Sequence, residues 1–381
     1  MNTVQEIINC YRAKNPGTRH AVQVEKVFTH MQQCGTLDMG YHHYRCTHKG
    51  CTYSKMQYHS CHDRHCPRCG SQRSDQWVED RGRDLLPCVY YHVVFTVPHE
   101  LNSIFLGNMK VTYDLLFKSV SETLLDFAGN PRYLGAVPGI ITVLHTWGQN
   151  LSYHPHLHCI ITGGGMRRNR SWKQLPFRGD GFLFPVKALR KKYRGKLLDF
   201  LQQAIIGKTI RLHPSLNWHR LKTQLYAVEW NVYAKSVMAG PMQVIGYLGR
   251  YTHKVAISNR RIIEANEHSG VCFRWRDYRD NDKVKEMTLP LDEFVDRLAL
   301  HILPKGFVKI RQYGIWAYRE KSKRIGDLLL NMNLPGPPLP VVIPFYLRLM
   351  EKTGIDIFRC PVCKNRTLEI ARVVYRSRAP V

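Results

Sequence analysis

Six of the twelve cysteines in this 381-residue chain lie between Cys34 and Cys69. So short a segment buries few apolar side chains, and its fold therefore needs another source of stability. The chain begins with neither the basic start nor the apolar run of a signal peptide, and no stretch approaches the ~20 apolar residues of a membrane span. These features predict a cytoplasmic protein with reduced thiols, in which metal binding explains the cysteines better than disulfides do.

The spacing of these cysteines is typical of structural zinc, which takes four thiolate or imidazole ligands. Cys46 and Cys51 are separated by four residues, and Cys66 and Cys69 by two. The sequence therefore predicts one or two structural Zn²⁺ ions in this segment. One partition assigns Cys46, Cys51, Cys66 and Cys69 to the first ion and Cys34, His42, Cys61 and His65 to the second.

A further cysteine pair, Cys360 and Cys363, lies near the end of the chain. It resembles half of a zinc knuckle, and the sequence around it offers no obvious second half. The pair is therefore either a relic or borrows ligands from another segment. For the cysteines between Cys34 and Cys69 the alternative is a set of free thiols in a small core.

Lys and Arg outnumber Asp and Glu by 56 to 29, which gives a formal net charge of +27. An excess of this size favours a polyanionic partner, with nucleic acid as the first candidate and an anionic membrane surface as the second. Residues 166–196 are the densest basic stretch, in which Trp172, Phe177 and Tyr193 are placed to stack on unpaired bases. A solvated face without a partner is the alternative. The candidate phosphate contacts in this stretch are Arg167, Arg168, Arg170, Lys173, Arg190, Lys191, Lys192 and Arg194.

Hydrophobic periodicity predicts a mixture of strands and helices. Residues 89–97, for example, are β-branched and aromatic and end at Pro98. The Pro-rich residues 333–340 form the clearest linker. The expected strands are 89–97, 139–145, 156–162 and short strands within 255–289, and the expected helices are 4–11, 22–31, 101–127, 185–206, 218–238, 241–252 and 291–301.

Three histidines cluster at one end of the strand expected at 156–162. Alternate residues of a strand share a face, so His156 and His158 point the same way. Pro155 biases His154 toward an extended conformation that brings it to that face. Two imidazoles on one strand are half of a site for Mn²⁺, Mg²⁺ or Zn²⁺. The alternative is a row of histidines on a solvent-facing strand.

A pair of tyrosines lies on the helix expected at 241–252. Tyr247 and Tyr251 stand four residues apart in line with Gln243, so the three share one stripe, with the tyrosines about 6 Å apart along the axis. A phenol can attack phosphorus and hold the cut strand covalently. Arg250 and Lys254 are placed to bind phosphates beside it. The alternative is an aromatic stripe that packs in the core.

Five segments that carry these residues occur in a recognisable order. They are Ser60-Cys-His-Asp-Arg-His-Cys-Pro-Arg-Cys69, Phe95-Thr-Val-Pro-His-Glu-Leu101, His145-Thr-Trp-Gly-Gln-Asn-Leu-Ser-Tyr-His-Pro-His-Leu-His158, Tyr247-Leu-Gly-Arg-Tyr251 and Leu303-Pro-Lys-Gly-Phe-Val-Lys-Ile-Arg-Gln-Tyr-Gly314. A His-hydrophobic-His strand followed by a tyrosine-bearing helix resembles the HUH endonuclease superfamily. Over about residues 30 to 320 the chain resembles, more closely, the two-tyrosine rolling-circle transposases of the insertion-sequence-91 family.

This resemblance implies an α+β fold. A small Cys/His zinc-binding domain, which recognises DNA, would precede an HUH endonuclease domain with a central antiparallel sheet flanked by helices. The expected boundaries are 1–85 for the zinc domain and 86–320 for the catalytic domain, with a basic, helical insertion at about 166–240. Residues 321–381 would form a tail with the linker and the second cysteine pair.

The resemblance also implies a mechanism. His156 and His158 would hold Mg²⁺ or Mn²⁺, with Gln243 as the third ligand and His154 and Gln149 as its competitors. Tyr247 or Tyr251 would attack single-stranded DNA at an end of the insertion sequence, leaving a 5′-phosphotyrosine and a free 3′-hydroxyl, and the second tyrosine would serve strand transfer into target DNA.

Prokaryotic relatives of this kind imply a place on the nucleoid, no membrane, and room for a homo-oligomer and for host replication proteins as partners. Two other functions stay open at this point. The first is a metal-dependent nuclease in which the histidines activate water and the tyrosines are core residues. The second is a non-catalytic zinc-finger protein that binds DNA.

Overall fold

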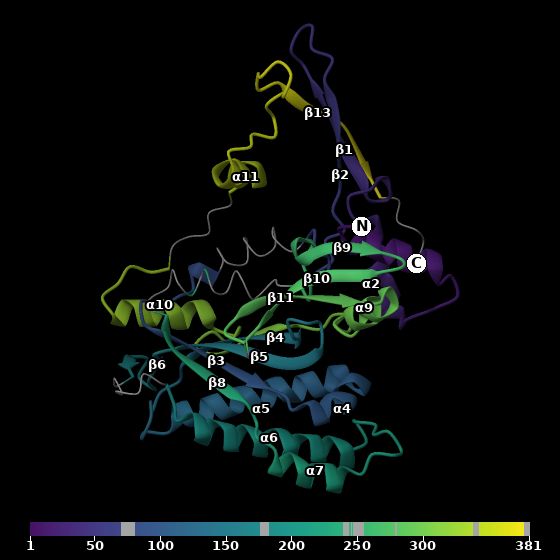
Figure 1. Cartoon of the computed structure of the whole chain (residues 1–381). Coiled ribbons are helices and arrows are strands. Elements are labelled where there is room, and N and C mark those ends of the chain that lie inside the picture. Colours follow the sequence, from purple (N-terminus) through teal and green to yellow (C-terminus); the bar gives the residue numbers. More distant parts are fainter. Residues whose placement is uncertain are drawn as a thin grey trace.

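The computed structural model of the chain describes residues 1–69, 81–175, 183–238, 244, 246, 255–278, 280–337 and 343–376. Its centre is a five-stranded antiparallel sheet with the strand order β12-β4-β5-β3-β8 (Figure 1). The predicted strands at 89–97, 139–145 and 156–162 are confirmed as its three central members. The strands are β12 (Ile310–Gly314), β4 (Gly139–Trp147), β5 (Tyr153–Thr162), β3 (Tyr90–Thr96) and β8 (Val232–Met238).

A layer of helices covers one face of this sheet (Figure 1). Every second residue of the central strands points into this layer, so that Leu157, Cys159 and Leu144 are almost completely removed from solvent. Burial of each leucine contributes about 1.5–3 kcal/mol. The layer consists of α4 (Asn102–Gly107), α5 (Met109–Gly129), α6 (Val186–Ile206) and α7 (Trp218–Ala227).

A second antiparallel sheet packs with the N-terminal helices. Phe28 of the first segment and Phe273 and Phe294 of the later one are fully buried in the same core. Thr3 and Glu6 form a capping box that begins the first helix. The elements of this unit are α1 (Val4–Lys14), α2 (Val22–Gln33), β9 (Ile262–Asn266), β10 (Gly270–Asp277), β11 (Lys283–Leu289) and α9 (Leu291–Ala299).

A third sheet projects from the body as an arm and joins the two ends of the chain (Figure 1). Its strand order is β13-β1-β2, with Gly40 opposite Tyr375 and Cys46 opposite Leu368. The residues after 321 are therefore not a separate tail, because their strand completes an N-terminal sheet. Among the described residues, the other strands and α-helices are β1 (Gly40–Cys46), β2 (Ser54–Tyr58), β13 (Leu368–Tyr375), the hairpin β6 (Gly164–Met166) and β7 (Trp172–Gln174), α10 (Lys321–Asn331) and α11 (Phe345–Thr353).

Two predicted helices differ from the structure. The helix expected at 101–127 is divided at Asn108, whose side-chain amide donates to the carbonyls of Ile104 and Arg211 and so anchors a break between α4 and α5. The helix expected at 218–238 ends at Ala227, because the residues from Val232 onward pair with the edge of β3 as β8. A tertiary pairing of this kind overrides local helical periodicity.

The helix expected at 241–252 lies outside the described residues except for Val244 and Gly246, which are both helical. Within the part of the chain that the structure describes, no helix combines the length and the apolar character that crossing a bilayer requires.

Candidate active site and thiol clusters

Three histidines meet on the face of the central sheet opposite the layer of α4 to α7. His145 comes from β4, and His156 and His158 come from β5. The antiparallel register places His145 opposite His156 and Val143 opposite His158, so all three imidazoles stand on one face of the hairpin. One ring nitrogen from each histidine lies within 4.8 Å of those of the other two. The hairpin therefore assembles a three-imidazole site without help from distant segments.

Hydrogen bonds orient two of these rings. Nδ1 of His156 donates to the carbonyl of His154 at 2.7 Å, so its Nε2 carries the lone pair that a metal would bind. Nδ1 of His158 lies 3.1 Å from Nε2 of His92, a neighbour on β3 whose ring stacks on that of His158. Contacts of this kind hold ligand rings in place and fix their tautomers.

The burial of the three histidines suits a catalytic centre better than a closed structural one. His145 is 3% exposed and stacks on Trp147, whereas His156 and His158 are only half-buried. Catalytic metal sites use three protein ligands and keep a position for water or substrate. An imidazole set of this size fits a divalent transition metal, which accepts nitrogen donors more readily than Mg²⁺ does.

The third histidine differs from the residues that the sequence predicted as third ligand. His154 is not part of the group of three, and Gln149 donates instead to the hydroxyl of Tyr278 at 2.9 Å. Gln243 lies outside the described residues. The sequence alone does not place His145 in the site, because its position there depends on the register between β4 and β5. A short hairpin between 145 and 156 brings these two residues opposite each other.

The two candidate nucleophiles, Tyr247 and Tyr251, also lie outside the described residues, as do Arg250 and Lys254. The helical residue Val244 is described and is fully buried in a cluster that includes Ile141 of β4 and Ile160 of β5. Ile160 is two residues from His158, so it shares the histidine face. Val244 thus packs against the sheet on the side of the three imidazoles.

The first of two thiol clusters joins Cys34, at the end of α2, to Cys61, Cys66 and Cys69. Their sulfur atoms all lie within 4.8 Å of one another, with 3.4 Å between Cys34 and Cys69. His65 is not among them: its ring contacts Asp63 and accepts a hydrogen bond from the amide of Leu303. Burial opposes the ionisation of Asp63, but the hydrogen bonds from His65 outweigh it and hold the pKa of this carboxyl well below its ordinary value.

The second thiol cluster joins Cys46 and Cys51 to Cys360 and Cys363. The partition predicted from the sequence is therefore wrong in both halves. His42 also belongs to neither cluster, because its Nδ1 lies 2.8 Å from Nε2 of His59. The error has a physical source: the pairing of β13 with β1 brings residues more than 300 positions apart together, and no local spacing reveals it.

Comparison with known proteins identifies the family. Residues 3–97 match the family model "Transposase zinc-binding domain", and residues 139–324 match the family model "Putative transposase". The "Putative transposase y4qJ" of Sinorhizobium fredii is 40% identical over 364 residues, which cover 93% of this chain and 89% of that protein. The chain belongs to the insertion-sequence-91 family of transposases.

A second relative of this transposase is the transposase for insertion sequence element IS801 from Pseudomonas savastanoi pv. phaseolicola, 30% identical over 92% of this chain and 84% of the relative. Among solved structures, the metal-bound conjugative relaxase TrwC in complex with oriT DNA matches 43% of this chain and 73% of its own. That match has 14% identity and a TM-score of 0.23. The expected family and the expected α+β fold with an N-terminal zinc-binding region are confirmed.

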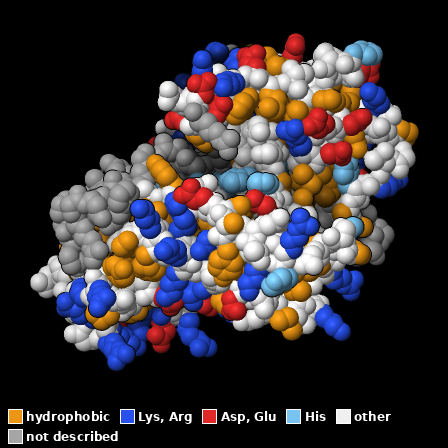
Figure 2. All heavy atoms as spheres, turned by 60° about the horizontal axis from the view of Figure 1, so that its bottom comes forward, with side chains coloured by type: hydrophobic (Ala, Val, Ile, Leu, Met, Phe, Trp, Pro, Cys, Tyr) orange, Lys and Arg blue, Asp and Glu red, His pale blue; other side chains and the backbone are white. Residues whose placement is uncertain are grey.

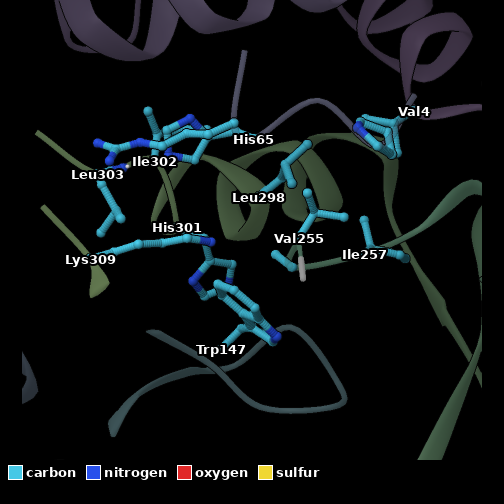
Figure 3. A pocket seen from close by; sticks show the side chains of 13 residues that line it. Val4, His65, Trp147, Val255, Ile257, Leu298, His301, Ile302, Leu303 and Lys309 are labelled. Carbon is cyan, nitrogen blue, oxygen red and sulfur yellow. Dashed lines mark hydrogen bonds between the residues drawn. The ribbon is translucent and has the colours of Figure 1, made fainter. Parts of the chain in front are cut away.

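A small cavity of the transposase is lined by His65 and by Trp147 of β4 (Figure 3). His301 and Lys309 point into it beside Trp147 (Figure 3). Burial lowers the pKa of His301 to about 4 and that of Lys309 to about 8. His301 contacts the hydroxyl of Thr146 and the carbonyl of Leu151, so it ties both ends of the β4–β5 connection together.

The basic residues of the transposase do not form one surface. The hairpin β6–β7 carries Arg167, Arg168, Arg170 and Lys173, and its Met166 and Trp172 pack against the cluster that contains Val244. Arg190, Lys191, Lys192 and Arg194 lie on α6, in the layer on the opposite face of the sheet.

Acidic partners and burial change the predicted roles of several residues in this stretch. Arg190 pairs with Glu229, Lys192 with Asp126 at 2.7 Å, and Arg170 with Asp327. Figure 2 shows Lys and Arg mixed with Asp and Glu on the side of the molecule that carries this layer. Tyr193 is fully buried and donates to the carbonyl of Thr96, so its predicted stacking on bases is wrong. Phe177 lies outside the described residues.

Proposed function

We propose that this transposase cuts and rejoins single-stranded DNA at the ends of an insertion sequence, with Tyr247 or Tyr251 as nucleophile at a metal held by His145, His156 and His158. The observation that carries the proposal is the convergence of the three imidazoles on one face of the sheet. The family assignment supports DNA transposition as the activity. The histidine group is the proposed location of the catalytic metal.

Two features of the chain would form the metal site. The hairpin register brings the three imidazoles together, and His92 and the carbonyl of His154 fix two of the rings. A divalent ion bound there would act as a Lewis acid on the scissile phosphate. Mg²⁺ and Mn²⁺ are the ions expected from the family, and the nitrogen-rich donor set favours Mn²⁺ over Mg²⁺.

The position of Val244 supports the tyrosines as nucleophiles. Residues three and seven positions apart share a face of a helix, so a helix that continues from Val244 would present Tyr247 and Tyr251 toward the sheet. Val244 itself is buried on the histidine side. In the proposed step the phenol oxygen bonds to phosphorus and the bond from phosphorus to the 3′-oxygen breaks. The phenol proton is transferred to the 3′-oxygen, which leaves a 5′-phosphotyrosine and a free 3′-hydroxyl.

Cations near this helix would position the phosphate backbone. Arg250 and Lys254 belong to the tyrosine segment, and the β6–β7 hairpin packs against the same cluster as Val244. Contacts from such residues orient a strand without reading its sequence. The basic residues of α6 lie on the other face of the sheet and are not part of this proposal.

A suicide oligonucleotide separates this mechanism from a water-activating nuclease. A single-stranded substrate from the element's end, with a break just beyond the cleavage site, should leave a protein–DNA adduct that survives denaturation. The adduct should disappear in Tyr247→Phe/Tyr251→Phe and in His156→Ala, while both variants still bind the oligonucleotide. Cleavage without any adduct would favour the water nuclease, and binding without cleavage would favour a DNA-binding protein.

A further inference from the structure

We propose that Cys46, Cys51, Cys360 and Cys363 bind a second structural Zn²⁺, which fastens the C-terminal segment to the zinc-binding segment at the start of the chain. The match to the zinc-binding domain ends at residue 97, so half of these ligands lie outside it. This zinc clasp, the four thiols with their ion, is independent of the histidine site and of the proposed reaction.

The distances between the sulfur atoms fit tetrahedral zinc. Sγ of Cys46 lies 3.7 Å from that of Cys363, and Sγ of Cys51 lies 3.8 Å from that of Cys360. Four sulfurs at about 2.3 Å from a zinc ion form a tetrahedron whose edges are about 3.8 Å. A disulfide requires about 2.05 Å between two sulfurs, and it would leave the other two thiols without a role.

The backbone around the thiols has the form of two facing knuckles. One turn joins β1 to β2 between Cys46 and Cys51, and the other, from Cys360 to Asn365, is closed by the amide of Cys360 on the carbonyl of Asn365 at 2.8 Å. The hydroxyl of Thr367 contacts Sγ of Cys46 at 3.1 Å and Sγ of Cys363 at 3.7 Å. A hydroxyl in this position donates to metal-bound thiolates and supports the ligand geometry.

The arm has almost no apolar core that would hold it together without a metal. Among the described residues, its buried cluster consists of Tyr44, Cys46, Cys360 and Leu368, with Tyr53 and Phe358 partly buried against it. Two of these four are proposed ligands, so little apolar burial remains to offset the entropy of ordering β13. The first thiol cluster, by contrast, adjoins the large core shared by α1, α2 and α9. The zinc clasp is therefore the part of the molecule whose folding depends most on its metal.

Cobalt substitution of the full-length protein tests the proposal without any variant. Thiolate-bound Co²⁺ gives charge-transfer absorption that scales with the number of cobalt–sulfur bonds, and the histidine site contributes none. We expect this absorption to rise until about two equivalents of Co²⁺ are bound per chain, as two sites of four thiolates require. Saturation at about one equivalent would overturn the zinc clasp.

Paired variants locate the second ion. Cys360→Ser/Cys363→Ser should lower thiolate-bound Co²⁺ from about two equivalents to about one. It should also speed amide exchange in β13, while the amides of α1 and α2 keep their protection. Cys10→Ser/Cys272→Ser, which changes two half-buried cysteines outside both clusters, is the matched control and should keep both ions. Two equivalents retained in Cys360→Ser/Cys363→Ser would contradict the proposal.

Discussion

The two faces of the central sheet are built from alternate residues of the same strands, yet they serve different purposes. On β5, Leu157 and Cys159 are fully buried against the helical layer, whereas His156 and His158 are half-buried and meet His145. The first face contributes to stability through apolar burial. Under the proposed function, the half-buried histidines of the second face would hold the metal and meet the substrate. Because the side-chain period of a strand is two, substitutions one residue apart should separate folding from chemistry.

The largest effect on metal affinity and DNA cleavage should come from replacing a histidine of the three-imidazole site. His145→Ala removes one of three candidate metal ligands, so we expect metal affinity and DNA cleavage each to fall by more than about a hundredfold, beyond the loss typical of supporting residues. Metal titration by calorimetry and cleavage of an oligonucleotide measure the two losses. His154→Ala is the control, because His154 lies on the same strand outside the group of three, and it should lose less than about tenfold. Equal losses in both variants would argue against His145 as a ligand.

The helical face should respond in the opposite way. Leu157→Ala leaves a cavity in a fully buried site, and the free energy of unfolding should fall by about 2–5 kcal/mol. Metal affinity measured well below the melting temperature should change little, because Leu157 points away from the imidazoles. Chemical denaturation and metal titration of the same sample provide both numbers. A Leu157→Ala protein that keeps its stability but loses its metal would reverse the assignment of the two faces.

The contrast between the faces was largely readable from the sequence. Alternation predicted that His156 and His158 share a face, and β-branched runs located the three central strands. The place of His145 in the site depends on the β4–β5 register, which the pattern of a single strand does not reveal. The same limit explains β8, whose strand conformation depends on pairing with β3 rather than on its own periodicity.

Long-range pairing set the other limit of prediction. Zinc was predicted from cysteine spacing, but the true grouping joins Cys46 and Cys51 to a pair more than 300 residues away through β1 and β13. Charge was misleading for a related reason. The run from 166 to 196 is continuous in sequence, whereas the fold divides it between the β6–β7 hairpin and α6 on different sides of the sheet.

Acidification should loosen the hairpin that presents the histidines. The pKa of buried His301 is lowered to about 4 from 6.5, so between these values the unfolded chain binds more protons than the folded one. Stability should therefore fall as pH drops from about 6.5 to about 4, by about 3 kcal/mol from this group. Denaturation at a series of pH values should show a shallower slope in His301→Gln than in the parent. An unchanged slope would remove His301 as its cause.

A smaller effect should follow from the residue that supports the histidine face from β3. His92→Ala removes the ring that contacts Nδ1 of His158 at 3.1 Å, and loss of such a contact weakens metal binding by about 10–100-fold. His92→Gln keeps a polar partner on β3 and should recover part of the affinity. If His92→Ala binds metal as the parent does, the stacked pair is a packing feature alone.

The smallest effect concerns the basic residues of the two faces. Arg167 lies on the hairpin beside the cluster of Val244, and its replacement by Ala should reduce the slope of log affinity against log salt for single-stranded DNA by about one. Arg190 lies on α6 and pairs with Glu229, so Arg190→Ala should leave that slope nearly unchanged. Fluorescence anisotropy at several salt concentrations compares the two variants directly. If Arg190→Ala lowers the slope as much as Arg167→Ala, DNA contacts the helical layer as well. The two faces of the sheet would then both take part in DNA binding.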